Sequence, residues 1–415
     1  MSVAYTSDVL IVGAGVGGLS LAIRLARKGW QVRILQEQVS VPPRRRPEII
    51  QPAGLQALDE LGLFAHLYKQ DVTRVETFHF RRIGGRPLCR VDYRALNHPY
   101  PYALIALPQQ SRRAFLDGLQ DHPGVQIHWG ACLTGVLRRG YRIVGAKAIE
   151  NGEEREFRAP VTIGADGSAS RLRAMAGITT HVKRYPNAFV GMLVTCPDSM
   201  KVDQTVHYDL GRGEILGCFP CSKSQLCLLF MVPADRAQER DGPLLKSLKD
   251  RIAAIRPELA EPVSAVVGWD QVSWQAPVRV RLGTWVIDGA AFMGDAAHAC
   301  HPHVAQGSFQ AMEDARVLAD ALQDPRTGAE NFSARRLKLY EQFRRPIVER
   351  LQCVADEYAW LWETKNLFLS YMRDRIFRSI GRQPALLYKV AATEAGIAPS
   401  PLTFMERLQA LGLCA

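Results

Sequence analysis

The sequence lacks several features that mark particular classes of protein. No run of about 18 apolar residues occurs, so a transmembrane helix is not expected. The first residues carry no basic segment ahead of an apolar one, which argues against a secretory signal peptide. Only nine cysteines occur in 415 residues. This excludes a disulfide-stapled scaffold and favours reduced thiols in a cytoplasmic protein.

Composition and charge narrow the class further. The chain is 47% hydrophobic and 22% charged, which is enough apolar material to exclude intrinsic disorder. The formal net charge is +11, but arginine and lysine are dispersed along the chain in short clusters such as those at 44–46 and 81–82. Dispersed basic residues argue against a nucleic-acid partner and favour anionic small molecules.

A glycine motif lies near the start of the chain. Gly13, Gly15 and Gly18 form G-x-G-x-x-G between an apolar run that predicts a buried strand and a segment with helical spacing. Glycines in this context let the backbone N–H groups at a helix start approach a pyrophosphate. The motif therefore predicts a dinucleotide site, which also includes Val16 and Gly17.

The second strand of this unit ends in an unusual residue. A ribose-binding acid is expected about 20 residues after the glycine motif. That place holds Gln36, followed by Glu37. Either side chain can form a hydrogen bond with a ribose hydroxyl, so both are candidate cofactor-binding residues.

Two further motifs accompany the glycine loop. GADGSASRLR spans 164–173 and GDAAHACHPHVAQGSFQAMEDA spans 294–315. Together with GAGVGG at 13–18, they stand in the order typical of the single-component (class A) FAD-dependent aromatic hydroxylases. The sequence resembles that family over about residues 8–325, and the joint occurrence of three spaced motifs is highly specific.

The third motif has a physical interpretation beside the resemblance. Asp295 at a strand end can accept a hydrogen bond from a ribityl hydroxyl, and Pro302 redirects the chain. Gln306, Gly307 and Ser308 then open a helix. Its first N–H groups can point at the pyrimidine carbonyl of a flavin, where negative charge develops on reduction.

The resemblance implies further cofactor-binding residues. They are Arg46, Gln109 (with Gln110 as the alternative in register), Leu133, Asp166 and Gly167. The segment around Asp166 is expected to support FAD and to meet NADPH or NADH transiently, with Arg171 and Arg173 beside it.

The predicted fold class is α/β with interleaved parts. A Rossmann-like FAD-binding domain of the glutathione-reductase type is expected from 1–71, 107–180 and 285–330. A β-sheet substrate-binding domain is expected from 72–106 and 181–284, and a C-terminal helical region from 331–415.

Two residues depart from the family pattern. Ala305 replaces the first glycine of G-Q-G, and Phe309 stands where asparagine is usual. The Phe309 ring is expected to stack near the flavin edge or to narrow the substrate entrance. A distorted helix start at these residues would alter the place beside the flavin C4a atom where O2 reacts.

Several histidines and a cysteine lie inside the third motif. His298, Cys300, His301 and His303 are metal-ligand types, but no acidic cluster accompanies them, so no metal is expected. In the strand-like stretch 205–210, His207 or Tyr208 is expected to face the cavity. No catalytic side chain is assigned.

The resemblance implies a FAD-dependent monooxygenase that takes NADPH or NADH as a transient co-substrate. It would use O2 to hydroxylate or epoxidise an electron-rich aromatic or quinone- or quinolone-like small molecule of secondary metabolism, through a flavin C4a-hydroperoxide. The alternatives are a flavin-dependent reductase of an isoprenoid double bond, a flavin-dependent halogenase, and a non-catalytic flavin-binding module. The substrate, the oxidised position, the choice of nicotinamide and the oligomeric state stay open.

The C-terminal helices leave a second question open. Their leucine, aromatic and arginine residues are typical of core packing with a solvated basic face. The same pattern also fits a peripheral contact with an anionic membrane, in an otherwise cytoplasmic protein.

Overall fold

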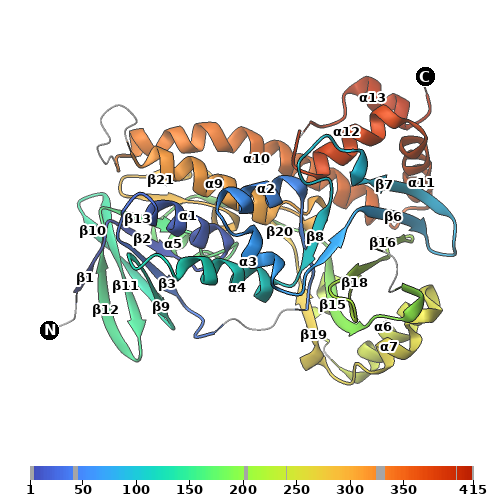
Figure 1. Cartoon of the computed structure of the whole chain (residues 1–415), viewed down its shortest axis with the longest axis horizontal. Coiled ribbons are helices and arrows are strands. Elements are labelled where there is room, and N and C mark those ends of the chain that lie inside the picture. Colours follow the sequence, from blue (N-terminus) through green and yellow to red (C-terminus); the bar gives the residue numbers. More distant parts are fainter. Residues whose placement is uncertain are drawn as a thin grey trace.

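The structure is a computed structural model that describes residues 4–40, 45–200, 204–239, 241–323, 332–398 and 400–413. It is an α/β fold with two large sheets, as the sequence predicts (Figure 1).

A six-stranded sheet carries the glycine motif. Its order is β21 (Val286–Ile287), β22 (Ala290–Phe292), β13 (Val161–Gly164), β2 (Val9–Val12), β3 (Val32–Gln36) and β9 (Val125–Trp129). All pairs from β22 to β9 are parallel, and β21 is an antiparallel edge strand. The central strands are buried along their length because helices cover a parallel sheet. Helices α1 (Val16–Ala26) and α9 (Gly307–Ala321) pack against each other beside this sheet.

Smaller sheets and helices surround this core. A four-stranded sheet of β1 (Ala4–Thr6), β12 (Glu153–Arg158), β11 (Arg142–Glu150) and β10 (Cys132–Arg139) lies at the left end of the view in Figure 1. A three-stranded sheet joins β4 (Glu48–Ile50), β8 (Ala103–Ala106) and β5 (Thr73–Val75). The nearby helices are α2 (Pro52–Glu60), α3 (Phe64–Tyr68), α4 (Pro108–Leu119), α5 (Arg171–Met175) and α8 (Asp295–His298).

A seven-stranded sheet builds the other half of the molecule. Its order is β19 (Val272–Gln275), β15 (Asn187–Thr195), β18 (Gln225–Pro233), β17 (Ile215–Pro220), β16 (Thr205–Leu210), β6 (Thr77–Arg82) and β7 (Pro87–Asp92). Helices α6 (Gly242–Ile255) and α7 (Ala260–Ser264) supply residues to the core on one face. The strand pair β14 (Thr180–Arg184) and β20 (Val278–Leu282) connects the two halves of the chain.

The C-terminal residues are helical, as expected. Helix α10 (Ala334–Trp362) packs along α9, and α11 (Leu367–Arg382), α12 (Pro384–Glu394) and α13 (Phe404–Ala410) gather beside β7 (Figure 1). Their apolar residues share a core with the seven-stranded sheet, including Trp362, Ala391 and Ala395. Within the described ranges, no helix is both long and apolar enough to cross a bilayer.

The sheets follow the predicted interleaving of the chain. Strands of the six-stranded sheet come from the segments assigned to cofactor binding, and strands of the seven-stranded sheet from those assigned to the substrate. The three-stranded sheet draws on both sets, because β8 pairs with β4 and with β5. The domain limits themselves stay a prediction. The cysteines that the structure describes are free thiols.

Candidate active site

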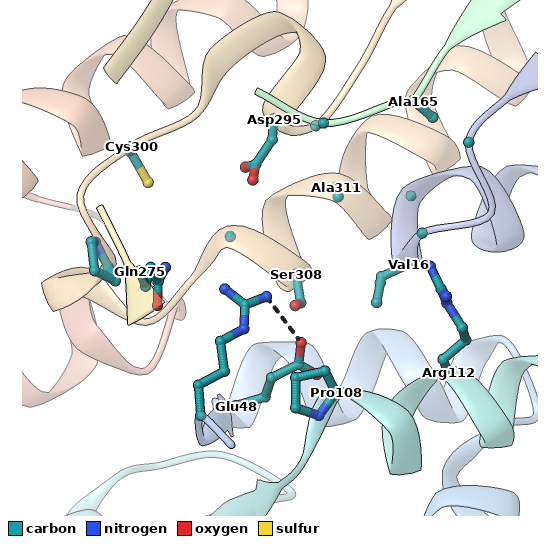
Figure 2. Close-up of a pocket in the computed structure, with 18 of the residues that line it drawn as sticks. Val16, Glu48, Pro108, Arg112, Ala165, Gln275, Asp295, Cys300, Ser308 and Ala311 are labelled. Atoms are coloured by element: carbon teal, nitrogen blue, oxygen red, sulfur yellow. Dashed lines mark ion pairs between the residues drawn. The ribbon is translucent and has the colours of Figure 1, made fainter. Parts of the chain in front are cut away.

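A cavity of about 710 Å³ runs from the glycine motif to the seven-stranded sheet. It is within the size range of small-molecule and cofactor sites. Most of the predicted cofactor-binding residues line it: Gly13, Gly15, Val16, Gly17, Gln36, Glu37, Arg46, Leu133, Asp166, Gly167, Asp295, Pro302, Gln306, Gly307 and Ser308. Figure 2 shows Val16, Asp295 and Ser308 around this space, although they come from distant parts of the chain.

Two predicted residues do not line the cavity. Gly18 packs inside the motif, where an added Cβ would lie 2.1 Å from the Gly13 carbonyl oxygen. Gln109 lies on α4, whose cavity-lining residues are Pro108 and Arg112. The alternative Gln110 is turned to its own helix start, where its side-chain oxygen accepts a hydrogen bond from the Leu107 N–H at 2.7 Å.

The glycine loop combines one tight contact with open space. A Cβ at Gly13 would lie 2.3 Å from the Ala165 carbonyl oxygen, and its φ of +107° is a backbone conformation that favours glycine. At Gly15, Gly167 and Gly307 an added Cβ would meet no protein atom within 4 Å. The loop is therefore held against the sheet while the cavity beside it stays free for a ligand.

Gln36 and Glu37 have different roles at the end of β3. The side-chain oxygen of Gln36 accepts a hydrogen bond from the Ala14 N–H at 2.8 Å, so it fixes the glycine loop. Its amide nitrogen is the group left for a ribose hydroxyl. The Glu37 side chain is 58% exposed and lies 3.0 Å from the Arg171 guanidinium at the cavity rim.

The second and third motifs are tied together by Arg173. Its guanidinium donates hydrogen bonds to the carbonyl oxygens of Ala296 at 2.7 Å and of Ser168 at 2.8 Å. The side chain is buried and is not part of a solvated helix face. Asp166 accepts a hydrogen bond from the Leu172 N–H, and burial raises the pKa of its carboxyl.

A buried network behind the third motif was missed at the sequence level. Asp314 on α9 accepts hydrogen bonds from the Gly294 N–H at 2.8 Å and the Arg344 Nε at 2.8 Å, and lies 2.5 Å from His298 Nε2. Burial alone would raise the pKa of Asp314, but His298 and Arg344 lower it to about 2. The network holds the Gly294–Asp295 turn in place. Its signal was the Asp–Ala pair that ends the motif.

The start of α9 is where the sequence departs from the family. Ala305 adopts a left-handed conformation with φ of +48°, which explains why glycine suits this position. Gln306 lines the cavity, while its side-chain amide donates to the Thr393 and Glu394 carbonyl oxygens at 2.6 and 3.2 Å. Phe309 does not line the cavity. Its side chain lies beside Gly54 of α2 and Gly396, close enough that a Cβ added at either glycine would contact it.

Polar atoms without protein partners face this cavity. Arg46 Nη2 lies 3.9 Å from Glu48 Oε1, the dashed pair in Figure 2, while Arg46 Nε and Glu48 Oε2 make no hydrogen bond. Asp166 Oδ1 is also buried without a partner. Arg112, which the sequence analysis did not select, points from α4 toward the start of α1 (Figure 2).

The other end of the cavity is largely aromatic and apolar. Phe189, Tyr208 and Phe219 line it together with Ile215 and Leu229. Tyr208 is thus the member of the predicted pair that faces the cavity; His207 is absent from the lining. Burial and the charge of Glu394 raise the pKa of the Tyr208 hydroxyl, so this side chain is neutral near pH 7.

Three residues of the histidine loop also line this end: Cys300, His301 and His303. Glu363 from the end of α10 lies within 3.0 Å of both histidines. His301, His303 and Glu363 have the donor types and spacing that could hold a metal ion. Glu363 lies 60 residues beyond His303, so the acid that meets these histidines could not be recognised from the sequence around them.

The residues fit FAD. The α1 start offers N–H groups and a positive dipole end to a pyrophosphate. Open space lies beside Gly15, Gly167 and Gly307, and unpartnered polar atoms at Arg46, Glu48 and Asp166 can bind a polar ligand.

Comparison with known proteins gives the same assignment. The model of the FAD-binding domain family matches residues 6–355. The 2-heptyl-3-hydroxy-4(1H)-quinolone synthase of Mycobacteroides abscessus is 29% identical over 351 residues, which cover 83% of this chain and 88% of that protein. The 6-methylpretetramide 4-monooxygenase of Streptomyces rimosus is 27% identical over 409 residues, covering 97% of this chain and 92% of that protein.

Solved structures show the same fold. The p-nitrophenol 4-monooxygenase PnpA of Pseudomonas putida has a TM-score of 0.82 at 19% identity, covering 97% of this chain and 100% of that one. PqsL of P. aeruginosa in complex with 2-aminobenzoylacetate has a TM-score of 0.73 at 24% identity, covering 88% and 99%. With the three motifs gathered on one cavity, these matches show that the chain belongs to the FAD-binding domain family and is a FAD-dependent monooxygenase of the class A aromatic hydroxylase type.

Proposed function

We propose that this enzyme hydroxylates or epoxidises an electron-rich aromatic or quinolone-like ring. The observation that carries the proposal is the continuity of one cavity from the glycine loop to the wall of Phe189, Tyr208 and Phe219. Aromatic side chains favour stacked or edge-to-face contacts with a planar ring. The two curated relatives, named for a hydroxyquinolone and for methylpretetramide, support this substrate class.

The cofactor is proposed to follow the length of this cavity. Its pyrophosphate would lie at the start of α1, beside Gly13 and Gly15, and its ribityl chain near Asp295. Its ring system would lie at the start of α9, where Gly307 and Ser308 line the cavity and the first backbone N–H groups of the helix have no partner within the helix. FAD supplies the activation of O2 after reduction by NADPH or NADH, and the protein excludes water and orients the substrate.

The structure favours a catalytic role over a blocked binding module. A non-catalytic flavin-binding module would result if the Phe309 ring blocked the place where O2 meets the flavin. Phe309 instead packs between α2 and the residues that follow α12, outside the cavity lining.

The test uses the purified holoenzyme with NADPH or NADH and a panel of phenols and 4-quinolones, while O2 uptake is followed. We expect substrate-stimulated NAD(P)H oxidation with matching O2 consumption. Anaerobic turnover of an alkene would instead support the reductase, a chlorinated or brominated product in the presence of halide would support the halogenase, and absence of a flavin spectrum would overturn the proposal.

A cavity-filling variant tests whether the aromatic end of the cavity binds the substrate. Leu229→Trp places a large side chain in the aromatic end, far from the glycine loop. We expect retained FAD and lost stimulation by substrate. Leu339→Trp, the same change at a side chain that is 47% exposed on α10, is the control and should behave as wild type.

We further propose a cytoplasmic enzyme that touches anionic membranes peripherally. Leu367, Phe368 and Phe404 are 66%, 67% and 74% exposed on α11 and α13. Arg378 and Arg382 of α11 line a surface hollow. Apolar side chains beside basic ones suit an interface with acidic lipids. Sedimentation with phosphatidylglycerol vesicles, but not with phosphatidylcholine vesicles, is expected, and Phe368→Ser should weaken it; equal recovery with both lipids would contradict the proposal.

A further inference from the structure

A buried histidine–carboxylate cluster stands at the substrate end of the cavity. His303 Nε2 forms a hydrogen bond with Glu363 Oε1 at 2.9 Å, and His301 Nε2 lies 3.0 Å from the same oxygen. Asn187 donates a hydrogen bond to the other carboxylate oxygen at 2.9 Å. The three ionisable side chains are at most 6% exposed. The loop that carries the two histidines follows Cys300, whose thiol points into the space in Figure 2.

The two imidazoles of this cluster differ in their surroundings. Burial alone would raise the pKa of Glu363, but the two histidines lower it, so the group is a carboxylate at neutral pH. Burial and the neighbouring His303 lower the pKa of His301 to about 4, and its Nδ1 accepts a weak hydrogen bond from the His303 N–H at 3.4 Å. His301 is therefore a neutral ring whose Nδ1 is already engaged.

His303 differs from His301 at its second nitrogen. Because its Nε2 is directed at the Glu363 carboxylate, the N–H at Nε2 is the group that donates to that carboxylate, and Nδ1 is the nitrogen left to exchange a proton with a ligand. Within the described part of the chain, no hydrogen bond to Nδ1 of His303 is found, and the residue lines the cavity. An imidazole that lines the cavity, with one nitrogen held by a buried carboxylate and the other without a protein partner, has the arrangement of a general base.

We propose that His303 is the base that deprotonates a ring hydroxyl of the substrate, and that Glu363 is the positioning residue that holds it in the reactive tautomer. This inference rests on the proposed function. The O–H bond of the substrate breaks, its electron pair stays on oxygen, and an N–H bond forms at Nδ1. The imidazolium is then balanced by the Glu363 carboxylate. Ionisation makes the ring more electron-rich, so the substrate class is a phenol or enol, not a simple alkene.

Other charged groups around the cluster are already paired or neutral. The Tyr185 ring packs on His301, with centroids 4.5 Å apart, and its hydroxyl donates to Asp356. Asp356 also meets Lys183 and Arg279, which balance its charge. Burial raises the pKa of the Cys300 thiol to about 12, so it is neutral. Phe189 and Trp362 enclose His303 with apolar rings. Glu363 is thus the carboxylate in direct contact with the proposed base.

The test measures ionisation of a bound probe, separately from turnover. p-Nitrophenol is added to the oxidised holoenzyme without nicotinamide, and the phenolate absorbance is titrated against pH. Wild type is expected to bind the phenolate preferentially. In His303→Gln, the apparent pKa of the bound probe should rise by at least one unit. At pH values below that pKa, the fraction of probe bound as phenolate should fall tenfold. The acid limb of the plot of kcat against pH should disappear.

Further variants separate positioning from folding. Glu363→Gln should raise the apparent pKa of the bound probe by a smaller amount, and Glu363→Asp should restore part of the wild-type value. His128→Gln is the matched control. His128 Nδ1 lies 2.8 Å from Glu150 Oε1, so the two residues form a similar pair, and neither of them lines the cavity. It should change neither the probe pKa nor the kcat profile. If His303→Gln does not fold, Glu363→Gln carries the test alone.

Two outcomes would overturn the inference while leaving the proposed function standing. One is an unchanged probe pKa and an unchanged kcat profile in His303→Gln or, where that variant does not fold, in Glu363→Gln, each with full FAD. The other is failure of wild-type holoenzyme to bind the phenol while it still oxygenates another substrate. A wild-type protein without flavin absorbance or O2 uptake would overturn the proposed function instead.

Discussion

Replacement of Asp314 by asparagine tests whether the third motif depends on its buried network. Asp314 is fully buried and binds the Gly294 N–H, His298 Nε2 and Arg344 Nε, all at 2.5–2.8 Å. Asparagine keeps the shape but removes the charge. It leaves the Arg344 guanidinium, whose side chain is 3% exposed, without a counterion.

The magnitude follows from that stranded cation. Removal of one partner from a buried ion pair costs about 3–5 kcal/mol. With an m-value of about 3 kcal/mol per M of urea, this lowers the unfolding midpoint by roughly 1–1.7 M. Because Gly294 and Asp295 lie in the turn that Asp314 holds, FAD retention should fall as well. The assay follows flavin release and circular dichroism during urea unfolding.

Two comparisons decide the outcome. Asp320→Asn on the same helix removes an acid that is 68% exposed and paired with Lys28, so it should cost less than about 1 kcal/mol. Adding Arg344→Met to Asp314→Asn should recover part of the loss, since the unpaired cation is gone. A midpoint for Asp314→Asn within 0.3 M, roughly 1 kcal/mol, of the Asp320→Asn value would refute the reasoning.

Three further predictions follow from single residues. Gly13→Ala should abolish FAD binding and lower the stability of the protein, because the added Cβ would lie 2.3 Å from the Ala165 carbonyl oxygen. Gly15→Ala should reduce FAD affinity at unchanged apoprotein stability, because its Cβ would meet no protein atom within 4 Å. Titration of the apoprotein with FAD and urea unfolding distinguish the two variants. Ala305→Gly should stabilise by about 1 kcal/mol in urea unfolding, since φ is +48° there, and a destabilised variant would contradict this. The pKa of Asp314 is about 2 in the folded protein and 3.8 in a free side chain. This difference adds about 2 kcal/mol to the free energy of unfolding above pH 4, and the contribution is lost as the pH falls through 2. Asp314→Asn should remove this pH dependence from acid unfolding.

The sequence alone determined the cofactor class and the order of the fold. Gly13, Gly15 and Gly18 act over a few residues, since the close approach of Gly18 to the Gly13 carbonyl is contained in the loop. Strand and helix periodicity are likewise local, so the strand–loop–helix unit and the helical C-terminus could be predicted. Such features depend on neighbours in the chain, and one sequence displays them directly.

Only the tertiary structure decided which side chains act together. Gln36 reaches back to Ala14, Asp314 meets Arg344, and Glu363 meets His303 across 22, 30 and 60 residues of chain. The Asp314–Arg344 contact depends on how helices α9 and α10 pack, and the other two depend on how loops lie against neighbouring elements. The spacing of these residues leaves no periodic trace in the sequence. Phe309 is turned away from the cavity and packs beside α2 and the residues after α12, and Arg173 is buried where it meets the Ala296 and Ser168 carbonyl oxygens. Side-chain direction and desolvation are properties of the assembled core, so they could not be predicted from the order of residues.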